Sequence, residues 1–211
     1  MHPAAPNLDL LLIRHASTAW TLAGRYQGRK DPRLSPAGHA EAARLAGQLG
    51  RLPIGVILSS PQARALETAR LLAETTGAPL RIDPRLVELD HGQWEGLTQA
   101  EVKARWPGDL RAWKRTPASA CPTGGEMLAV AAARLTAVLA DLARQPLDGP
   151  IAAIVTHEVL IRLALLAARG QGPEEFRSLS VKPASAHPLH LRDGRLVPCQ
   201  TFFLNPVFDN A

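Results

Sequence analysis

The sequence has no apolar run long enough to span a membrane, and its first residues lack the basic start and apolar core of a signal peptide. We therefore expect a cytoplasmic protein that makes no membrane contact. Cysteine is scarce, because only Cys121 and Cys199 are present and their spacing is not that of a metal site. Both are predicted to be reduced thiols without a structural role.

Aromatic residues make up only 4% of the chain, and no run of Lys and Arg exceeds two residues. The formal net charge is +5 and the sequence pI is about 9.9, a balance also found in nucleic-acid-binding proteins. Such proteins need clustered basic residues and aromatic platforms for bases, and both are scarce here. The scattered charge favours a solvated surface with a positively lined pocket for an anion, so no nucleic-acid partner is expected.

The 211 residues suffice for one good-sized core, and we expect a single domain over residues 1–211. Apolar runs of strand length alternate with stretches of helical periodicity, which predicts an α/β fold with a largely parallel sheet. The run at 151–155 is continuously apolar, as is typical of a central parallel strand. Strands are predicted over 9–13, 54–58, 80–82 and 151–155, and helices over about 36–49, from 61 onward, over 125–145 and over 158–168.

Two helix starts carry the same signal. Ser35-Pro36 and Ser60-Pro61 are each predicted to be an N-cap followed by proline at the first helical position.

The stretch 91–125 differs in character from the rest of the chain. It holds three of the four tryptophans, Trp94, Trp106 and Trp113, with prolines between them. This composition predicts short helices in an excursion from the sheet that caps a site. Packing onto the body of the protein is the expected role of at least two of these tryptophans.

A hairpin is predicted near the C-terminal end of the chain. Asp193-Gly194 lies between two mixed runs, which is a hairpin signal, and Pro188 and Pro198 indicate edge or bulged strands. His187 lies in the first of these strands and is not counted as catalytic. A homodimer through the hairpin stays open, although its prolines oppose continuous strand pairing.

Reactive side chains follow the first predicted strand. The segment LLIRHASTAW begins as an apolar run and then places Arg14 and His15 at the carboxyl end of the strand, where ligands bind in open α/β sheets. Imidazole beside guanidinium suits a phosphate ester, because one group can attack phosphorus while the other binds its oxygens. On this motif alone, a chance pair at a strand end is an equal alternative.

Three further groups recur at later strand ends, namely Arg64, Glu88 and His157. Each has a structural alternative: a solvated charge for Arg64, a surface ion pair with Arg85 for Glu88, and a hydrogen-bonded structural role for His157. Parallel neighbouring strands open their loops on one edge of the sheet. The sequence therefore predicts that these groups converge with the first pair in a single pocket.

The segments that carry this chemistry are RHASTAW, GRYQGRKDPRLSPAGHAEA, LSSPQARALETA, ELDHGQWEG and IVTHEVLIR. In this order they resemble the histidine phosphatase superfamily, in its phosphoglycerate-mutase-like branch, and the resemblance covers the chain from Leu10 to about Leu191. It implies a three-layer α/β/α sandwich around a mostly parallel sheet, to which the excursion predicted from composition adds a small helical cap over the site.

The resemblance also implies a role for each group at the strand ends. His15 matches the nucleophile that becomes phosphorylated, and Arg14 and Arg64 match phosphate-binding arginines. His157 matches the second histidine, expected as a cation that contacts the transferred phosphoryl group. Glu88 matches the proton donor.

Further positions are implied to bind substrate. Gln27 and Gly28 match the loop that closes over the phosphate, and Ser17 and Thr18 match positions that contact phosphate or substrate. Thr21 stands where Asn is common near the phosphate, so it keeps a hydroxyl and loses an amide donor.

Two departures lie beside the two histidines. Ala16 stands where Gly is usual, and its methyl group is expected to be tolerated. Glu158 also stands at a position that is usually Gly. Because a carboxylate near a phosphate dianion is unfavourable, Glu158 is expected to face away from the pocket.

The resemblance implies a metal-independent phosphomonoester phosphatase that acts through a phosphohistidine on a small phosphorylated metabolite, without a cofactor. The runner-up is a cofactor-dependent phosphoglycerate mutase, which returns the phosphoryl group to a bound intermediate. A non-catalytic module that binds a phosphorylated ligand is a third alternative, disfavoured because all five reactive groups are present. Nucleic-acid binding is a fourth, and it predicts steeply salt-dependent affinity.

Overall fold

A computed structural model of the protein describes residues 7–199 and shows a six-stranded sheet in the order β3-β2-β4-β1-β5-β6. The first four strands run parallel, whereas β5 pairs antiparallel with both β1 and β6. The mostly parallel sheet is thus confirmed, with β4 inside it as predicted. The strands are β1 (Leu8–Arg14), β2 (Ile54–Ser59), β3 (Leu80–Ile82), β4 (Ile151–Thr156), β5 (Ala186–Arg192) and β6 (Arg195–Pro198).

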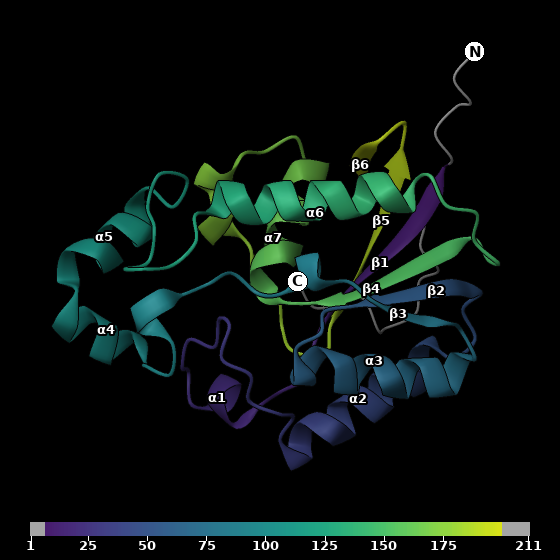
Figure 1. Ribbon diagram of the computed structural model, residues 1–211, viewed down its shortest axis with the longest axis horizontal. Coiled ribbons are helices and arrows are strands. Elements are labelled where there is room, and N and C mark those ends of the chain that lie inside the picture. The colour runs from purple at the N-terminus through teal and green to yellow at the C-terminus, as the bar shows by residue number, and fades with distance from the viewer. Residues whose placement is uncertain (1–6, 200–211) are drawn as a thin grey trace.

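Helices cover both faces of the sheet, which confirms the three-layer sandwich. In Figure 1, α6 and α7 lie above the sheet, and α2 and α3 lie below it. No helix in the described part of the chain is long and apolar enough to cross a membrane. The helices are α1 (Ala19–Leu22), α2 (Pro36–Leu49), α3 (Ala63–Thr76), α4 (Gln99–Arg105), α5 (Pro107–Arg115), α6 (Leu128–Leu142) and α7 (Glu158–Ala168), with 3₁₀ turns η1 (Pro84–Leu86), η2 (Gly92–Trp94) and η3 (Pro173–Ser178).

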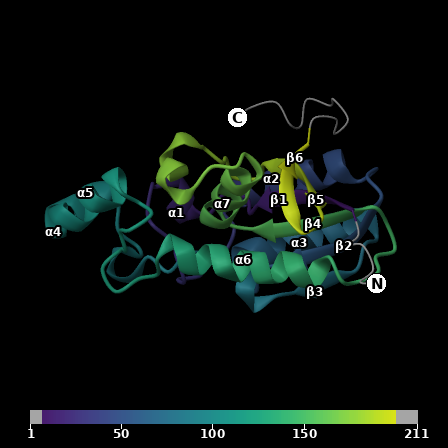
Figure 2. The same ribbon diagram turned by 90° about the horizontal axis from the view of Figure 1, so that it is seen from above.

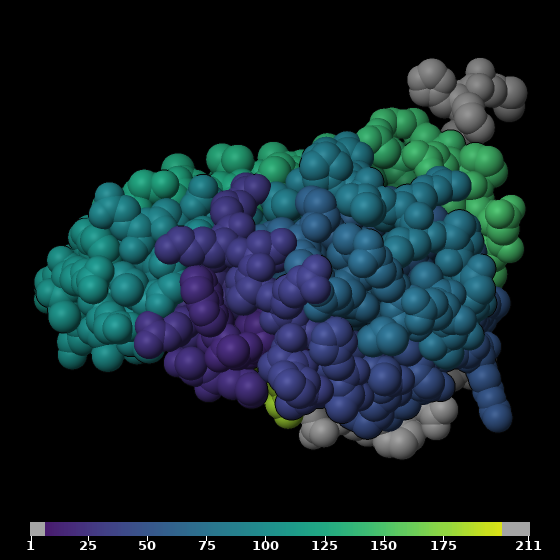
Figure 3. Space-filling view, turned by 60° about the horizontal axis from the view of Figure 1, so that its bottom comes forward, coloured from purple at the N-terminus to yellow at the C-terminus, as the bar shows by residue number. Residues whose placement is uncertain are grey.

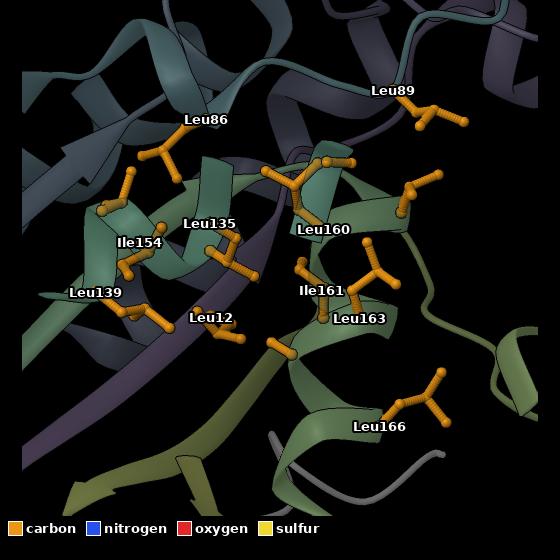
Figure 4. Packing of buried hydrophobic residues seen from close by; sticks show 14 of the residues in the cluster. Leu12, Leu86, Leu89, Leu135, Leu139, Ile154, Leu160, Ile161, Leu163 and Leu166 are labelled. Atoms are coloured by element: carbon orange, nitrogen blue, oxygen red, sulfur yellow. The ribbon is translucent and has the colours of Figure 1, made fainter. Parts of the chain in front are cut away.

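Two apolar clusters fill the space between the layers. Leu12 and Ile154 point from the sheet towards Leu135 of α6 and Leu160 of α7 (Figure 4). On the other face, alternate residues of the same strands pack under α2 and α3. All six residues of β4 are buried because both faces of this strand are covered, which explains why its sequence is continuously apolar.

The two predicted helix starts have different outcomes. Ser35 caps α2, because its hydroxyl accepts a hydrogen bond from Gly38 N at 3.0 Å. The prediction for Ser60-Pro61 is wrong, since α3 begins at Ala63 and its first N–H donates to the carboxylate of Asp31, at 2.8 and 2.9 Å. A side chain from a distant loop thus replaces the local cap.

The helix predicted over 125–145 is shorter, because α6 spans Leu128–Leu142. The two residues Gly125 and Glu126, which were predicted to be helical, form backbone hydrogen bonds with the loops at either end of the excursion instead. Gly125 N donates to the carbonyl of Pro122, and Glu126 N donates to the carbonyl of Asp90. Their backbone donors are therefore taken by loop contacts instead of helical ones.

The hairpin is confirmed, with Asp193 at φ 49° and Gly194 at φ 75° in its two-residue turn. Pro198 lies in β6, the outermost strand of the described sheet, which confirms the predicted edge strand. The same prediction is wrong for Pro188, because its strand β5 lies between β1 and β6. The ladder to β6 ends at the pair Leu189–Pro198, so Pro188 lies just beyond its last pair.

The excursion carries α4 and α5 away from the sheet, as Figures 1 and 2 show. Its surface adjoins that of the segment 18–34 (Figure 3), and an isolated bridge joins Arg25 to Thr98. Trp94 and Trp113 are buried and meet edge to face, with ring centroids 6.2 Å apart. Packing is thus confirmed for these two tryptophans.

Candidate active site

A cavity of about 300 Å³ opens at the carboxyl end of β1. Arg14 and His15 line it from that strand end, and Glu88 lines it from the segment that follows β3. The excursion contributes His91 and Trp113 to its wall. The cavity thus lies where the parallel strands release their loops, and the excursion closes one side of it.

His15 is buried in its wall and held in one tautomer. Its Nδ1 donates a hydrogen bond to the carbonyl oxygen of Ala16 at 2.8 Å, so Nε2 carries the lone pair. Burial, together with the Arg64 and Arg14 guanidinium groups, holds the pKa of His15 well below its usual range. The imidazole is therefore neutral at neutral pH. The methyl group of Ala16 is fully buried, and Ala16 N donates to the Thr68 hydroxyl at 3.1 Å.

His157 lies directly before α7 and packs against His15, with ring centroids 5.1 Å apart. Its Nε2 is 2.8 Å from the Ser60 hydroxyl oxygen, so the serine that does not cap α3 contacts this imidazole instead. Burial and the neighbouring Arg64 guanidinium lower the pKa of His157 well below its usual range. The imidazole is therefore neutral in this structure, and its cationic form beside a phosphoryl group stays a prediction.

Arg64 is completely buried in the first turn of α3, which excludes a solvated surface charge. Its terminal nitrogens donate to the carbonyl oxygens of Gly28 and Lys30, each at 2.9 Å. Burial lowers its pKa to about 10, so the group stays charged at neutral pH. Neither Arg64 nor His157 is among the residues that line the cavity, and both are completely buried.

Glu88 is buried, and its carboxylate accepts a hydrogen bond from Leu89 N at 2.8 Å. Burial raises its pKa, and the backbone hydrogen bond and the Arg64 guanidinium oppose that rise without cancelling it. The alternative of a surface pair with Arg85 is wrong, because Arg85 pairs with Asp83 at 2.7 Å and also with Asp141.

The substrate-binding positions divide into two groups. Gln27 and Gly28 line the cavity, and their contact with phosphate stays a prediction. Ser17, Thr18 and Thr21 are not among the residues that line it.

Their hydroxyl groups are used elsewhere. Ser17 Oγ donates to the carboxylate of Glu41 at 3.0 Å. Thr18 caps α1, and its hydroxyl also donates to Gln27 Oε1 at 2.9 Å. Thr21 Oγ1 accepts from Gln27 Nε2 at 2.9 Å, so both threonines orient the Gln27 amide beside the cavity.

Glu158 lines the cavity, which corrects the expectation that it faces away. Its Oε2 lies 2.8 Å from Arg14 Nη1, and its other oxygen contacts Arg162, four residues along α7. The two guanidinium groups attract the carboxylate into the cavity.

Sequence reasoning missed several residues of the wall. His91 lies three residues after Glu88, and burial lowers its pKa to about 4, so it is neutral. Its ring packs between Tyr26 and Trp113, at centroid distances of 5.0 and 6.3 Å. The spacing of Glu158 and Arg162, four apart on one helix, was the signal that could have revealed their pairing.

The described cavity holds a neutral imidazole with a free Nε2, a guanidinium beside it and a carboxyl group that burial keeps protonated to higher pH. This combination suits phosphoryl transfer, with a nucleophile, a charge stabiliser and a proton donor. Within residues 7–199, no group of three or more His, Cys, Asp or Glu side chains is placed to hold a metal ion.

Comparisons with known proteins agree with this chemistry. The family model described as "Histidine phosphatase superfamily (branch 1)" matches residues 10–200. Phosphoserine phosphatase 1 of Hydrogenobacter thermophilus is 35% identical over 190 residues, 90% of this chain and 90% of that protein. A solved structure of a mycobacterial glucosyl-3-phosphoglycerate phosphatase complexed with VO3 has 32% identity and a TM-score of 0.81, and the match covers 90% of this chain and 95% of that one.

A protein named as a probable phosphoglycerate mutase, from an Enterobacter species, is 31% identical over 158 residues, 73% of this chain and 71% of that protein. The two phosphatases match with higher identity and over more of the chain than this mutase. The comparisons therefore support a phosphatase over a mutase.

Proposed function

The chain belongs to the histidine phosphatase superfamily and is a phosphatase, and we propose that it hydrolyses small phosphomonoesters through a phosphohistidine on His15. The observation that carries the proposal is the hydrogen bond from His15 Nδ1 to the Ala16 carbonyl. It leaves Nε2 unprotonated in a cavity that Arg14 also lines. A tautomer fixed in this way is what an imidazole nucleophile needs.

In the first step, His15 Nε2 attacks phosphorus and the bond from phosphorus to the ester oxygen breaks. Arg14 and Arg64 stabilise the negative charge on the equatorial oxygens. Both terminal nitrogens of Arg64 donate to loop carbonyls, whereas its buried Nε has no hydrogen-bond partner among the described residues and is the donor proposed for a phosphate oxygen. Glu88 gives its proton to the leaving oxygen.

In the second step, water attacks phosphorus and the P–N bond breaks. The Glu88 carboxylate, now ionised, accepts the proton of the water, so the step returns both His15 and Glu88 to their starting forms. His157 lies against His15, where a phosphoryl dianion favours protonation of its imidazole. A cationic His157 is thus proposed for the loaded site, in contrast to the empty one.

The arginines supply the positive charge that a metal ion supplies in other phosphatases, so activity without metal is proposed. The named relatives act on phosphoserine and on glucosyl-3-phosphoglycerate, and both are small phosphorylated metabolites. We extend that general class to this chain. A cytoplasmic location and a homodimer stay predictions of the sequence.

The test is phosphate release from p-nitrophenyl phosphate and 3-phosphoglycerate in EDTA by the wild type and by His15→Ala. We expect metal-free release that falls about 10³-fold or more in the variant, because no other group replaces the nucleophile. His187→Ala is the matched control, since His187 does not line the cavity and contacts Ser185 instead. Retention of most activity in His15→Ala contradicts the phosphohistidine route.

A further inference from the structure

A carboxylate lies inside the cavity beside a proposed phosphate-binding arginine. Glu158 is the first residue of α7, and its side chain, 28% exposed, lines the cavity. One oxygen lies 2.8 Å from Arg14 Nη1 and the other contacts Arg162. The Arg162 guanidinium in turn lies over the ring of Phe176, 5.1 Å from its centroid, which helps to fix the pair.

Arg14 is thus engaged before any ligand arrives. Its Nη1 donates to the Val181 carbonyl and pairs with Glu158, while its Nε is buried without a hydrogen-bond partner among the described residues. A guanidinium offers its donors in a fixed planar fork. A phosphate that binds Arg14 therefore has to share this group with the Glu158 carboxylate or displace it.

We propose that Glu158 is a positioning residue that orients Arg14 in the empty cavity and competes with phosphate for it. The inference rests on the proposed function, because inorganic phosphate is the product of that reaction. The phosphate dianion and the carboxylate repel each other across the shared guanidinium, and Arg162 offsets only part of that charge. Glu158 thereby lowers affinity for phosphate and speeds its release after hydrolysis.

The test compares the wild type with Glu158→Gln, which keeps an oxygen that accepts from Arg14 and removes the charge. Titration calorimetry with inorganic phosphate measures affinity without turnover. We expect the dissociation constant of phosphate to fall about tenfold in Glu158→Gln, because one like charge near the dianion is gone. The inhibition constant of phosphate against p-nitrophenyl phosphate hydrolysis should fall by the same factor in Glu158→Gln. The KM of this variant should also fall, by a larger factor than kcat changes.

Asp141→Asn is the matched control, because Asp141 also pairs with two arginines, Arg85 and Arg144, and none of these three residues lines the cavity. It should leave phosphate affinity unchanged. A purely structural role for Glu158 predicts the opposite direction, with a lower melting temperature and weaker phosphate binding. Glu158→Ala provides a second variant, with the same direction expected, if Glu158→Gln does not fold.

Equal or weaker phosphate binding by the folded Glu158 variants overturns this inference. If the wild type hydrolyses esters and His15→Ala does not, that result leaves the proposed function intact. If the wild type hydrolyses no phosphomonoester, the proposed function fails, and calorimetry with phosphate still decides whether Glu158 competes for Arg14.

Discussion

A carboxyl group donates a proton near neutral pH only if its pKa is raised, and the surroundings of Glu88 act in both directions. Burial disfavours the carboxylate and raises the pKa, whereas the Leu89 N–H and the Arg64 and Arg14 guanidinium groups favour it. The carboxylate of Glu158 adds to the rise. The net direction is upwards because the group is almost completely removed from water.

Replacing Glu88 by Gln should slow hydrolysis of alkyl phosphates by about 10²–10⁴-fold, because the leaving alkoxide then receives no proton. The first step with p-nitrophenyl phosphate should slow far less, because nitrophenolate is a stable leaving group that needs no proton. The measurement is the ratio of kcat/KM for the two esters in each enzyme. An equal loss for both esters contradicts the role of proton donor.

The same variant also carries a pH signature. Glu88 is active when protonated, so wild-type kcat/KM for an alkyl phosphate should fall as pH rises through its raised pKa. His15 is active when neutral, so kcat/KM should rise as pH increases through its lowered pKa. Glu88→Gln should lose the fall on the alkaline side and keep the rise on the acidic side.

At the scale of elements, the loop whose carbonyl oxygens bind Arg64 is held in place by hydrogen bonds to the excursion. Glu95, just after η2, accepts hydrogen bonds from the backbone N–H groups of Arg29 and Lys30, at 2.6 and 3.0 Å. The carbonyl of Gly28 in the same loop accepts from Arg64. The excursion therefore positions a proposed phosphate-binding arginine through a loop, in addition to lining the cavity itself.

Gly28→Ala should disturb this arrangement. Gly28 has φ +55°, and an added Cβ would lie 2.0 Å from Glu95 Oε1, so the carboxylate has to move. We expect kcat/KM to fall about tenfold or more, on the general scale of a displaced positioning group. Gly24→Ala is the matched control, because Gly24 has φ +63° and open space around it.

Both substitutions place alanine in a left-handed backbone conformation, which lowers the free energy of unfolding by about 1–2 kcal/mol. Only Gly28→Ala should lose activity, as measured by steady-state kinetics beside urea unfolding. Equal activity in the two variants would mean that Glu95 adjusts without moving the loop.

At the scale of the whole molecule, the fold buries histidines in their neutral form. His15, His91 and His157 are all almost completely buried, and burial lowers the pKa of each. Burial also lowers the pKa of His187 in β5, to about 4. The unfolded chain binds protons at these groups from about pH 6.5 downwards, whereas the folded chain does not until much lower pH. The proposed active site thus makes the protein sensitive to acid.

The free energy of unfolding should therefore fall as pH decreases below about 6.5, at up to about 1.4 kcal/mol per pH unit for each histidine, or about 5.5 for the four together. The contribution of His91 should level off near pH 4, where its imidazole becomes protonated in the folded state as well. Urea unfolding at several pH values measures the slope. His15→Asn should reduce this slope by about one quarter.

Much of the fold could be predicted from the sequence because its signals are local. Apolar periodicity gave the strands and most helix spans, and Asp193-Gly194 gave the hairpin, since such turns need residues that accept positive φ. Local signals failed where a distant partner took over, as when the Asp31 carboxylate capped α3 in place of Ser60.

The sequence by itself determined which reactive groups follow which strands, and parallel order then required Arg14, His15, Glu88 and His157 to meet at one edge of the sheet. Only the tertiary structure decided the direction of Glu158 and the charge state of each histidine. These depend on burial and on charges brought together from far along the chain, because Glu158 meets an arginine 144 positions before it. Electrostatic interactions of this kind follow distance in space, which a pattern of neighbouring residues does not contain.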